Sequence, residues 1–460
     1  MRSASLKRGY GAEPPVGCRS RAPESFEAFA HLKNPGCVRA GIESKVKAVV
    51  HDGASNMRET GRANKWMDVS CSAHKLHLAV TGAMGVDKVS NSTISKCVGA
   101  ASRLVGHFSH SPLATTELEK RQQQMGVVGE NGQPLRLVQY VKTRWNSVHD
   151  MLQRLVKLRW PVVAVLFDRA IVKQQDAKTL EMRDEHWSLM SDLLPVLQPL
   201  QIMTELLCAE KNTSASVVYP LMYKLVNVDM AESDDDAATV RDFKRDIRKA
   251  LDDRFALSSS DTARHPFVIA TVLDPATKDC DLFPTAVRVA AYEHVRGLVD
   301  ATASADDQTP VDNDQEETSP PPAKRAKADP RTASLKFLQA STSAASPSRA
   351  QLQEFDRYLA APADDRARDA LQWWSANAQL YPATARIARE YLSVPATSAQ
   401  SERQFSAAGR LISKLRSRLT QIAWTLSSFF MKTCRPQWER SYSDRIFSAD
   451  IFLTVLLSFM

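Results

Sequence analysis

The sequence has no C-x-x-C pair, and its seven cysteines are an odd number at wide spacings. This pattern argues against a disulfide framework and against a complete zinc finger in the chain, because both need closely spaced partners. Unbridged cysteines fit best with a reducing, intracellular compartment. We therefore expect thiols in this chain rather than structural bridges.

The sequence also lacks a long hydrophobic run. Residues 1–17 are basic and contain proline and glycine without an apolar stretch, so they do not predict a signal peptide. The apolar stretch at 451–460 is shorter than the roughly 20 residues that a membrane-spanning helix needs. The sequence therefore predicts no membrane partner.

What is present is an ordinary globular composition. The 460 residues are 43% hydrophobic and 24% charged, and the length corresponds to two to four domains. Lys and Arg number 60 against 52 Asp and Glu, a net charge of +8. A mildly basic chain is compatible with a nucleic-acid partner, but scattered surface charge gives the same total.

Two short apolar runs near the start predict strands. Residues 46–50 form the first run, which a turn at Asp52-Gly53 closes, and residues 67–71 form the second. A buried helix is expected over 74–84. Residues 42–175 therefore begin with an α/β pattern.

From about residue 92 to 300, apolar residues recur every three or four positions and predict mainly helices. The stretches 145–159 and 187–197 are examples, and Pro195 and Pro199 are expected to interrupt the second. Residues 271–275 resemble the end of a strand or a loop.

The composition changes at 301–350, which has few bulky apolar residues and predicts a disordered acidic and basic linker. It contains three prolines followed by Lys324, Arg325 and Lys327. Such an exposed basic run is typical of a nuclear-import patch, although short basic runs also arise by chance. It predicts a nuclear location.

Helical pattern resumes at residue 352. From Phe405 onward, apolar residues recur at steps of three and four, which predicts a seam that packs on another helix. The seam residues are Phe405, Ala408, Ile412, Leu415, Leu419, Ile422, Leu426 and Phe429.

Two acids are candidates for chemistry. Asp52 follows a hydrophobic strand, where ligands and catalytic groups collect in α/β sheets, but Asp-Gly is also a common turn. Glu402 lies three residues before Phe405, so in a continuous helix it would lie on the same face as the seam residues. An acid on a packing face needs a partner or a cation, although a glutamate in a first helical turn is also favoured by the helix dipole.

Two other clusters could bind ligands. Cys71 and His74 form a C-x-x-H pair, half of a tetrahedral zinc site, or simply a buried thiol and a hydrogen-bonded imidazole. Arg144 and Trp145 lie in the stretch 143–147. They could contact a phosphate, or they could begin a helix with the indole in the core.

Taken in this order along the chain, these motifs resemble those of the hAT superfamily of DNA transposases and of the proteins derived from them. The most specific block is LSVPATSAQSERQFSAAG at 392–409 with RSRL at 416–419. Supporting blocks are KVKAVVHDGASNM at 45–57, CSAHKLHL at 71–78 and KTRWNS at 142–147.

The resemblance implies an α/β fold: an incomplete RNase H-like core interrupted by a large helical insertion, with a helical C-terminal dimerisation region. It divides the chain into an unassigned, disordered 1–41, core 42–175, insertion 176–300, linker 301–350, dimerisation region 351–433 and divergent tail 434–460. It also implies that Asp52 and Glu402 are catalytic ligands of Mg²⁺ or Mn²⁺. Cys71 and His74 would support the site, Arg144, Trp145 and Arg403 would contact DNA, and Phe405, Ile412, Leu415 and Leu419 would form the dimer.

The sequence departs from the family at its start. No Asp precedes Asp52, no earlier glutamate lies in strand-like sequence, and the family's N-terminal BED finger is not found. We therefore expect a transposase-derived homodimer, with DNA binding as a further expectation, that has lost catalysis. The alternatives are an active transposase from an incomplete gene model and a nuclear regulatory protein on the same scaffold.

Overall fold

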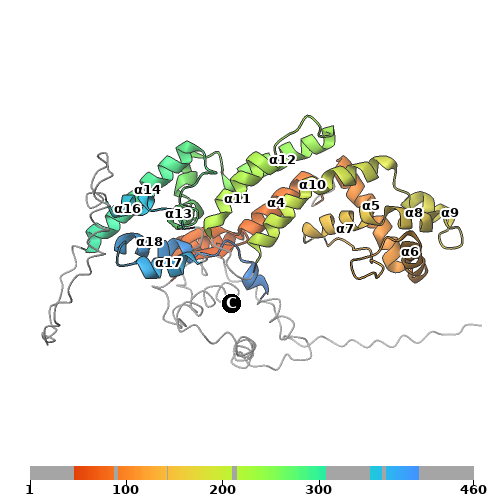
Figure 1. The fold of residues 1–460 in the computed structure, drawn as a ribbon, viewed down its shortest axis with the longest axis horizontal. Helices are drawn as coiled ribbons and strands as arrows, with labels where there is room; N and C mark the ends of the chain where they lie inside the picture. Colours follow the sequence, from red (N-terminus) through yellow and green to blue (C-terminus); the bar gives the residue numbers. More distant parts are fainter. Residues whose placement is uncertain are drawn as a thin grey trace, which may run out of the picture.

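The computed structural model describes residues 46–86, 92–141, 143–209, 215–306, 353–364 and 369–403. These residues are mainly helical, with one parallel sheet of two strands (Figure 1). This arrangement agrees with the α/β prediction in its coarse form, but an RNase H-like core is not established by it. The domain boundaries given above stay predictions.

The sheet pairs β1 (Ala48–His51) with β2 (Met67–Ser70), in register from Ala48 opposite Met67 to His51 opposite Ser70. The connection is α3 (Ser55–Ala63). A Cβ on Gly61 would lie 3.0 Å from Cγ1 of Val49, so glycine allows α3 to lie directly on β1. Both strands were predicted to within two residues, because a short apolar run ended by a turn is a distinctive pattern.

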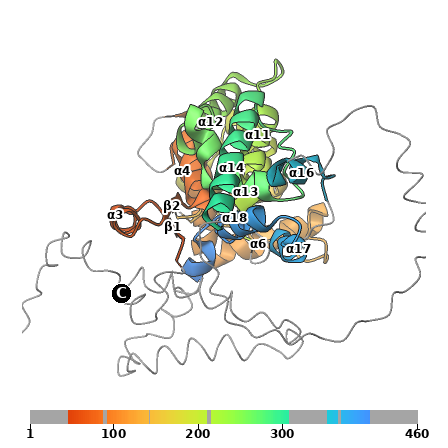
Figure 2. The ribbon, with the colours of Figure 1, turned by 90° about the vertical axis from the view of Figure 1, so that its left-hand side faces the viewer.

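The helices extend along the long axis in three groups (Figures 1 and 2). One end holds α5 (Thr93–His110), α6 (Pro112–Met125), α7 (Asn146–Lys157), α8 (Arg159–Phe167) and α9 (Gln174–Leu180). The centre holds α4 (Ser72–Met84), α10 (Asp184–Leu207), η2 (Ala215–Val217), α11 (Val218–Lys224), η3 (Leu225–Asp229) and α12 (Ala238–Phe255). The other end holds η4 (Ser260–Arg264), α13 (Pro266–Leu273), α14 (Thr285–Asp306), α16 (Glu354–Ala360), α17 (Ala370–Asn377) and α18 (Pro382–Leu392).

Helix α10 differs from its prediction because it continues through both Pro195 and Pro199. A proline inside a helix removes one backbone hydrogen bond and costs about 3 kcal/mol. Buried side chains on either side of the prolines, including Leu193, Leu197 and Leu200, offset that cost by packing against α4, α5, α7 and α12. Tertiary packing therefore overrides the local signal.

Helix α13 also differs from its prediction, because residues 266–273 are helical and only the following residues form a loop. Every residue from Phe267 to Leu273 is buried, so the helix has no polar face that could have distinguished it from a buried strand. It forms the core of its end of the molecule, against α14 and α18.

No helix among the described residues is both long and apolar enough to cross a bilayer.

Candidate functional site

The first candidate residue, Asp52, lies at the carboxyl end of β1 and is exposed. Its Oδ1 accepts a hydrogen bond from the backbone N–H of Ala54 at 3.2 Å. Gly53 between them has a φ of +101°, a conformation that favours glycine. The turn therefore directs the Asp52 side chain to solvent at the end of the sheet, and the other carboxylate oxygen is available there.

Beside Asp52, the imidazole of His51 is buried between two partners. The backbone N–H of Gly53 donates to Nδ1 at 2.9 Å, and Nε2 lies 2.5 Å from Oδ1 of Asp68 on β2. Because Nδ1 accepts, the proton must be on Nε2 and is donated to Asp68. The pair ties the strands together and fixes the turn that carries Asp52.

Cys71 connects the two strand ends to the last described segment. Its backbone N–H donates to the carbonyl of His51 at 2.7 Å, and its buried Sγ accepts from the backbone N–H of Ser398 at 3.4 Å. The backbone N–H of Ser72 donates to the carbonyl of Ala396 at 3.1 Å. These bonds bring residues 51–52 and 396–403 to the same end of the sheet.

Glu402 lies on the helical turn that follows this junction. Ser398 Oγ donates to its Oε1 at 2.8 Å. The sequence analysis placed this acid on an inward-packing face, but Glu402 is exposed. The reason is that Thr397, not Glu402, is the buried side chain here, where its Oγ1 donates to the carbonyl of Leu207 at 3.2 Å.

Cys208 and Arg403 complete the surroundings of this turn. The guanidinium of Arg403 donates to the carbonyl of Cys208, which ends α10. Burial raises the pKa of the Cys208 thiol, and the nearby Cys71 and Glu402 raise it further, although Arg403 opposes them. The thiol is therefore kept protonated. Arg403, exposed but hydrogen-bonded to α10, stays a predicted DNA contact.

A half-buried cation lies near Asp68. Lys75 in α4 has its Nζ 5.1 Å from the centre of the Phe255 ring, and burial lowers its pKa while Cys71 and Asp68 oppose the shift. His265 at the start of α13 has its pKa lowered to about 3 by burial and then by Lys75. The imidazole is neutral and caps α13, because Nδ1 accepts from the N–H of Phe267 at 3.2 Å.

Asp52 and Glu402 supply two carboxylates, the oxygen ligands that Mg²⁺ prefers. Within the ranges described, no three His, Cys, Asp or Glu side chains form a group that could hold a metal ion. Metal binding by Asp52 and Glu402 stays a prediction. His74 lies one turn before His77, with ring centres 6.3 Å apart, and its supporting role is likewise untested.

Comparisons with known proteins find one family model that matches the C-terminal part of the chain. The hAT family C-terminal dimerisation region matches residues 354–423. Residues 354–423 are therefore similar to a hAT dimerisation region. A curated relative, Zinc finger BED domain-containing protein 6 of Mus musculus, is 22% identical over 383 residues. That alignment covers 78% of this chain but 37% of the mouse protein, so the chain spans little more than a third of its length.

The hAT dimerisation region begins with helices that belong to the core of this chain. Tyr358 of α16 donates its hydroxyl proton to the carbonyl of Val272 at 3.2 Å. Trp374 of α17 donates from Nε1 to the carbonyl of Leu273 at 2.7 Å. The buried Lys278 donates from Nζ to the carbonyls of Tyr358, Leu359 and Ala361. The first part of the region is therefore fixed to α13 and to the loop after it.

Arg144 and Trp145 have different surroundings. The indole is 2% exposed and donates from Nε1 to Oγ1 of Thr204 at 3.2 Å, so Trp145 is the core residue that begins α7. It cannot contact DNA from there, which corrects its assignment as a DNA-binding residue. Arg144 is exposed and stays a candidate.

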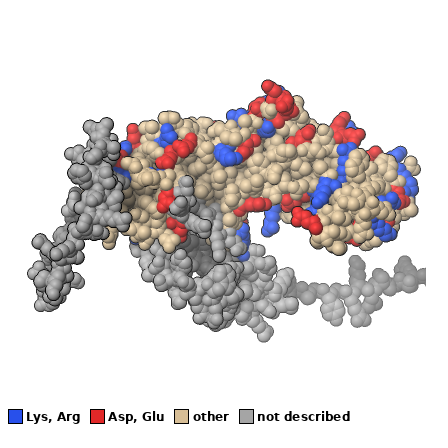
Figure 3. All heavy atoms as spheres, viewed as in Figure 1, with Lys and Arg blue, Asp and Glu red and all other residues tan. Residues whose placement is uncertain are grey.

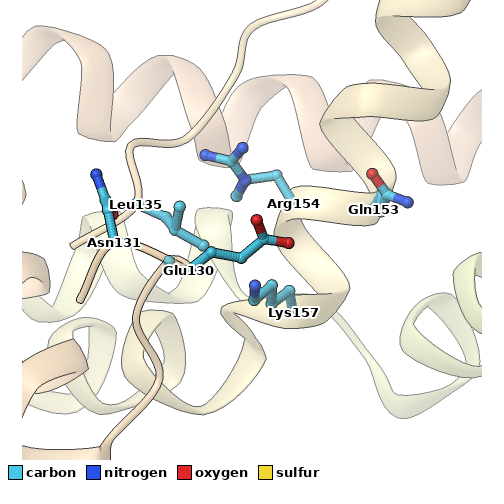
Figure 4. Close-up of a pocket in the computed structure, with 7 residues that line it drawn as sticks. Glu130, Asn131, Leu135, Gln153, Arg154 and Lys157 are labelled. Carbon is cyan, nitrogen blue, oxygen red and sulfur yellow. The ribbon is translucent and has the colours of Figure 1, made fainter. Parts of the chain in front are cut away.

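A shallow hollow near α7 holds another group of polar side chains (Figure 4). Glu130 extends between Arg154 and Lys157, and Nη1 of Arg154 donates to the carbonyl of Arg136 at 2.6 Å. Arg154 therefore already has a carbonyl partner, Glu130 forms no ion pair with either cation, and we assign no ligand to the hollow.

Several predicted residues lie outside the described ranges: Lys324, Arg325 and Lys327 of the basic run, and Phe405, Ile412, Leu415 and Leu419 of the seam. Conversely, the sequence analysis missed Asp68, Cys208 and Ser398. Asp68 could have been found, because parallel pairing of the predicted strands places it diagonally from His51. Cys208 and Ser398 depend on contacts across more than 190 residues, which no local pattern indicates.

Proposed function

We propose that this chain is a transposase-related protein that works by self-association through its hAT dimerisation region, and that this chain alone does not carry out DNA strand transfer. The match at 354–423 carries the first half of the proposal. The lack of an Asp before Asp52 carries the second, because two-metal chemistry with one ligand carboxylate missing is severely weakened.

The division of the hAT region suggests which residues associate. Helices α16–α18 place Tyr358, Trp374 and Ala388 in the core of their own chain, so these surfaces are not available to a second copy. The seam from Phe405 onward is the part of the match left for self-association. Its steps of three and four suit the packing of one helix on another.

Sedimentation velocity on the full chain tests self-association. We expect a dimer or higher oligomer at micromolar concentration, and a monomer when Ile412→Glu and Leu415→Glu place two charges in the seam. Ser413→Glu with Ser417→Glu adds the same two charges beside the seam and should leave the oligomer intact. A strict monomer for the unchanged chain, or equal loss in the control, would contradict the proposal.

The alternative, an active transposase, is favoured by one observation. The Cys71 N–H donates to the carbonyl of His51 and the Ser398 N–H donates to Cys71 Sγ, and these bonds bring the segments of Asp52 and Glu402 to one end of the sheet. A strand-transfer assay with Mg²⁺ or Mn²⁺ decides between the two. We expect no transfer. Activity that both Asp52→Asn and Glu402→Gln abolish would establish the alternative.

We also propose that this chain binds DNA and that it is located in the nucleus, and each of these two roles has its own test. Arg144→Gln with Arg403→Gln should weaken binding to duplex DNA in fluorescence anisotropy and reduce its salt dependence. Lys324, Arg325 and Lys327 changed to Ala should release a fluorescent fusion from the nucleus. An unchanged affinity or an unchanged location would remove the corresponding role.

A further inference from the structure

Helix α8 has apolar side chains on two sides, only one of which is covered. Pro161, Val162, Val165 and Leu166 are buried. On the other side, Trp160 is 65% exposed and Phe167 is 60% exposed. Between them lie the half-buried Val163 and Ala164. Positions 160, 163, 164 and 167 follow the helical repeat, so they form one stripe with exposed ends and a half-buried centre, which we call the α8 stripe.

The aromatic start of the stripe is held in place before any partner binds. The guanidinium of Arg159 lies 4.9 Å from the ring centre of Trp160 and 5.3 Å from that of Trp187. Its Nη2 is also 2.6 Å from Oδ1 of Asp184. An anchor that is ordered in advance loses less conformational entropy on binding.

The stripe lies in a basic part of the chain. Residues 92–183 contain fourteen Lys and Arg against seven Asp and Glu, a net +7 of the total +8. Residues 184–306 contain twelve against twenty-one, a net −9. Lys and Arg are accordingly frequent over α5–α9 in Figure 3, and a group of Asp and Glu lies at the tip beside α12.

The acids at the rim of the stripe are already paired. Asp168 lies 3.0 Å from Arg121, and Asp184 pairs with Arg159. In contrast, the exposed cations near the two ends of α8 form no ion pair with any residue that the structure describes: Lys157, Arg169 and Lys173. The stripe is therefore an apolar surface between unpaired positive charges.

We propose that the α8 stripe is the docking site for an acidic amphipathic helix of another protein. The stripe spans eight residues, from 160 to 167, and rises by about 10 Å, which is the length of about two turns of a partner helix. Apolar side chains on the partner would cover Trp160 and Phe167, and its acids would face the basic rim. Val163 and Ala164 disfavour a nucleic acid, because aliphatic groups supply neither stacking nor phosphate contacts.

The test uses the full chain and a synthetic probe. The probe is a fluorescein-labelled helical peptide of about 16 residues with Leu and Phe on one face and Glu on the other, and binding is measured by anisotropy. We expect micromolar affinity that falls at least tenfold in Trp160→Ala with Phe167→Ala. Lys157→Gln with Arg169→Gln and Lys173→Gln should weaken binding about threefold or more and flatten its salt dependence.

The controls distinguish binding at the α8 stripe from non-specific hydrophobic binding. Val228→Ala removes an equally exposed apolar side chain far along the sequence and should not change the affinity. A peptide with Lys in place of Glu should not bind. Equal affinity in the Trp160 and Phe167 double variant would overturn the proposal. It would also be overturned if that variant instead lost binding to a single-stranded oligonucleotide, or lost self-association.

Discussion

Two groups of aromatic side chains lie at opposite ends of this molecule and have opposite surroundings. At one end, Tyr358, Trp373, Trp374 and Tyr381 form a cluster with ring centres 4.9 to 6.4 Å apart. At the other, Trp160 and Phe167 of α8 face solvent. The first group belongs to the hAT dimerisation region, yet its packing is within the chain, whereas the second has apolar surface still to cover. The packed aromatic cluster therefore stabilises the fold, whereas the exposed aromatic side chains of α8 are available to bind another molecule.

Lys278→Met should strongly destabilise the aromatic end of the molecule. The ammonium group donates to three carbonyls at the end of α16 and also lies 5.3 Å from the ring centre of Tyr358. Its removal leaves buried carbonyls without a donor, so unfolding free energy should fall by about 2–4 kcal/mol in urea denaturation. Lys120→Met, at an exposed lysine, should stay within about 0.5 kcal/mol. A loss below about 1 kcal/mol for Lys278→Met would show that the hydrogen bonds from Lys278 to the end of α16 contribute little to stability.

The neighbouring Trp373 and Trp374 of α17 allow the effect of a buried hydrogen bond to be compared with that of ring packing. Trp374→Phe removes the donor to the carbonyl of Leu273 and should cost about 1–3 kcal/mol of unfolding free energy. Trp373→Phe retains an aromatic ring at a half-buried position and should cost less than about 1 kcal/mol. Denaturation of both variants by the same method checks the difference. Equal costs would mean that ring packing, rather than the buried hydrogen bond, holds α17.

The pH dependence of stability tests the burial of His265. Its pKa is lowered to about 3 in the folded chain, so between pH 6.5 and about 3 the unfolded state binds a proton that the folded state does not. Stability attributable to this group is therefore full above pH 6.5 and falls as the pH decreases, by up to about 1.4 kcal/mol per pH unit.

His265→Asn retains a side-chain acceptor for the N–H of Phe267 and removes the titration. We expect a shallower loss of unfolding free energy between pH 6.5 and 4.5 than in the unchanged chain. The same slope in both proteins would show that the imidazole is protonated in the folded state.

The smallest expected effect is at the exposed end. Trp160→Ala with Phe167→Ala should change unfolding free energy by no more than about 0.5 kcal/mol per site. Trp374→Ala at the other end should cost about 3–5 kcal/mol, as for a large buried side chain. A comparable loss from the α8 variant in thermal unfolding would show that the α8 stripe packs against its own chain.

The sequence predicted the strands around Val49 and Val69 and the turn at Gly53, because short apolar runs and turn residues are local signals. It did not predict α13, where an apolar run without polar positions fits a strand equally well. The exposure of Glu402 was also missed. That exposure depends on Thr397 contacting Leu207, a contact across 190 residues.

The candidate site was predicted only as separate pieces. Asp52 and Glu402 were chosen from the resemblance, and the hydrogen bonds through Cys71 that bring their segments together could not be read from spacing. Lys278 was not singled out at all. Nothing in the sequence distinguishes it from other lysines, because its partners follow about 80 residues later.

We propose that the hAT dimerisation region is divided: α16–α18 belong to the core of each chain, and the seam from Phe405 onward joins two chains. Hydrogen exchange followed by mass spectrometry, on the full chain at a series of dilutions across the association range, tests it directly. We predict that protection of residues 405–419 falls on dilution, while protection of α16–α18 stays constant. Protection of α16–α18 that falls in step with the loss of oligomer, with 405–419 unchanged, would contradict the claim.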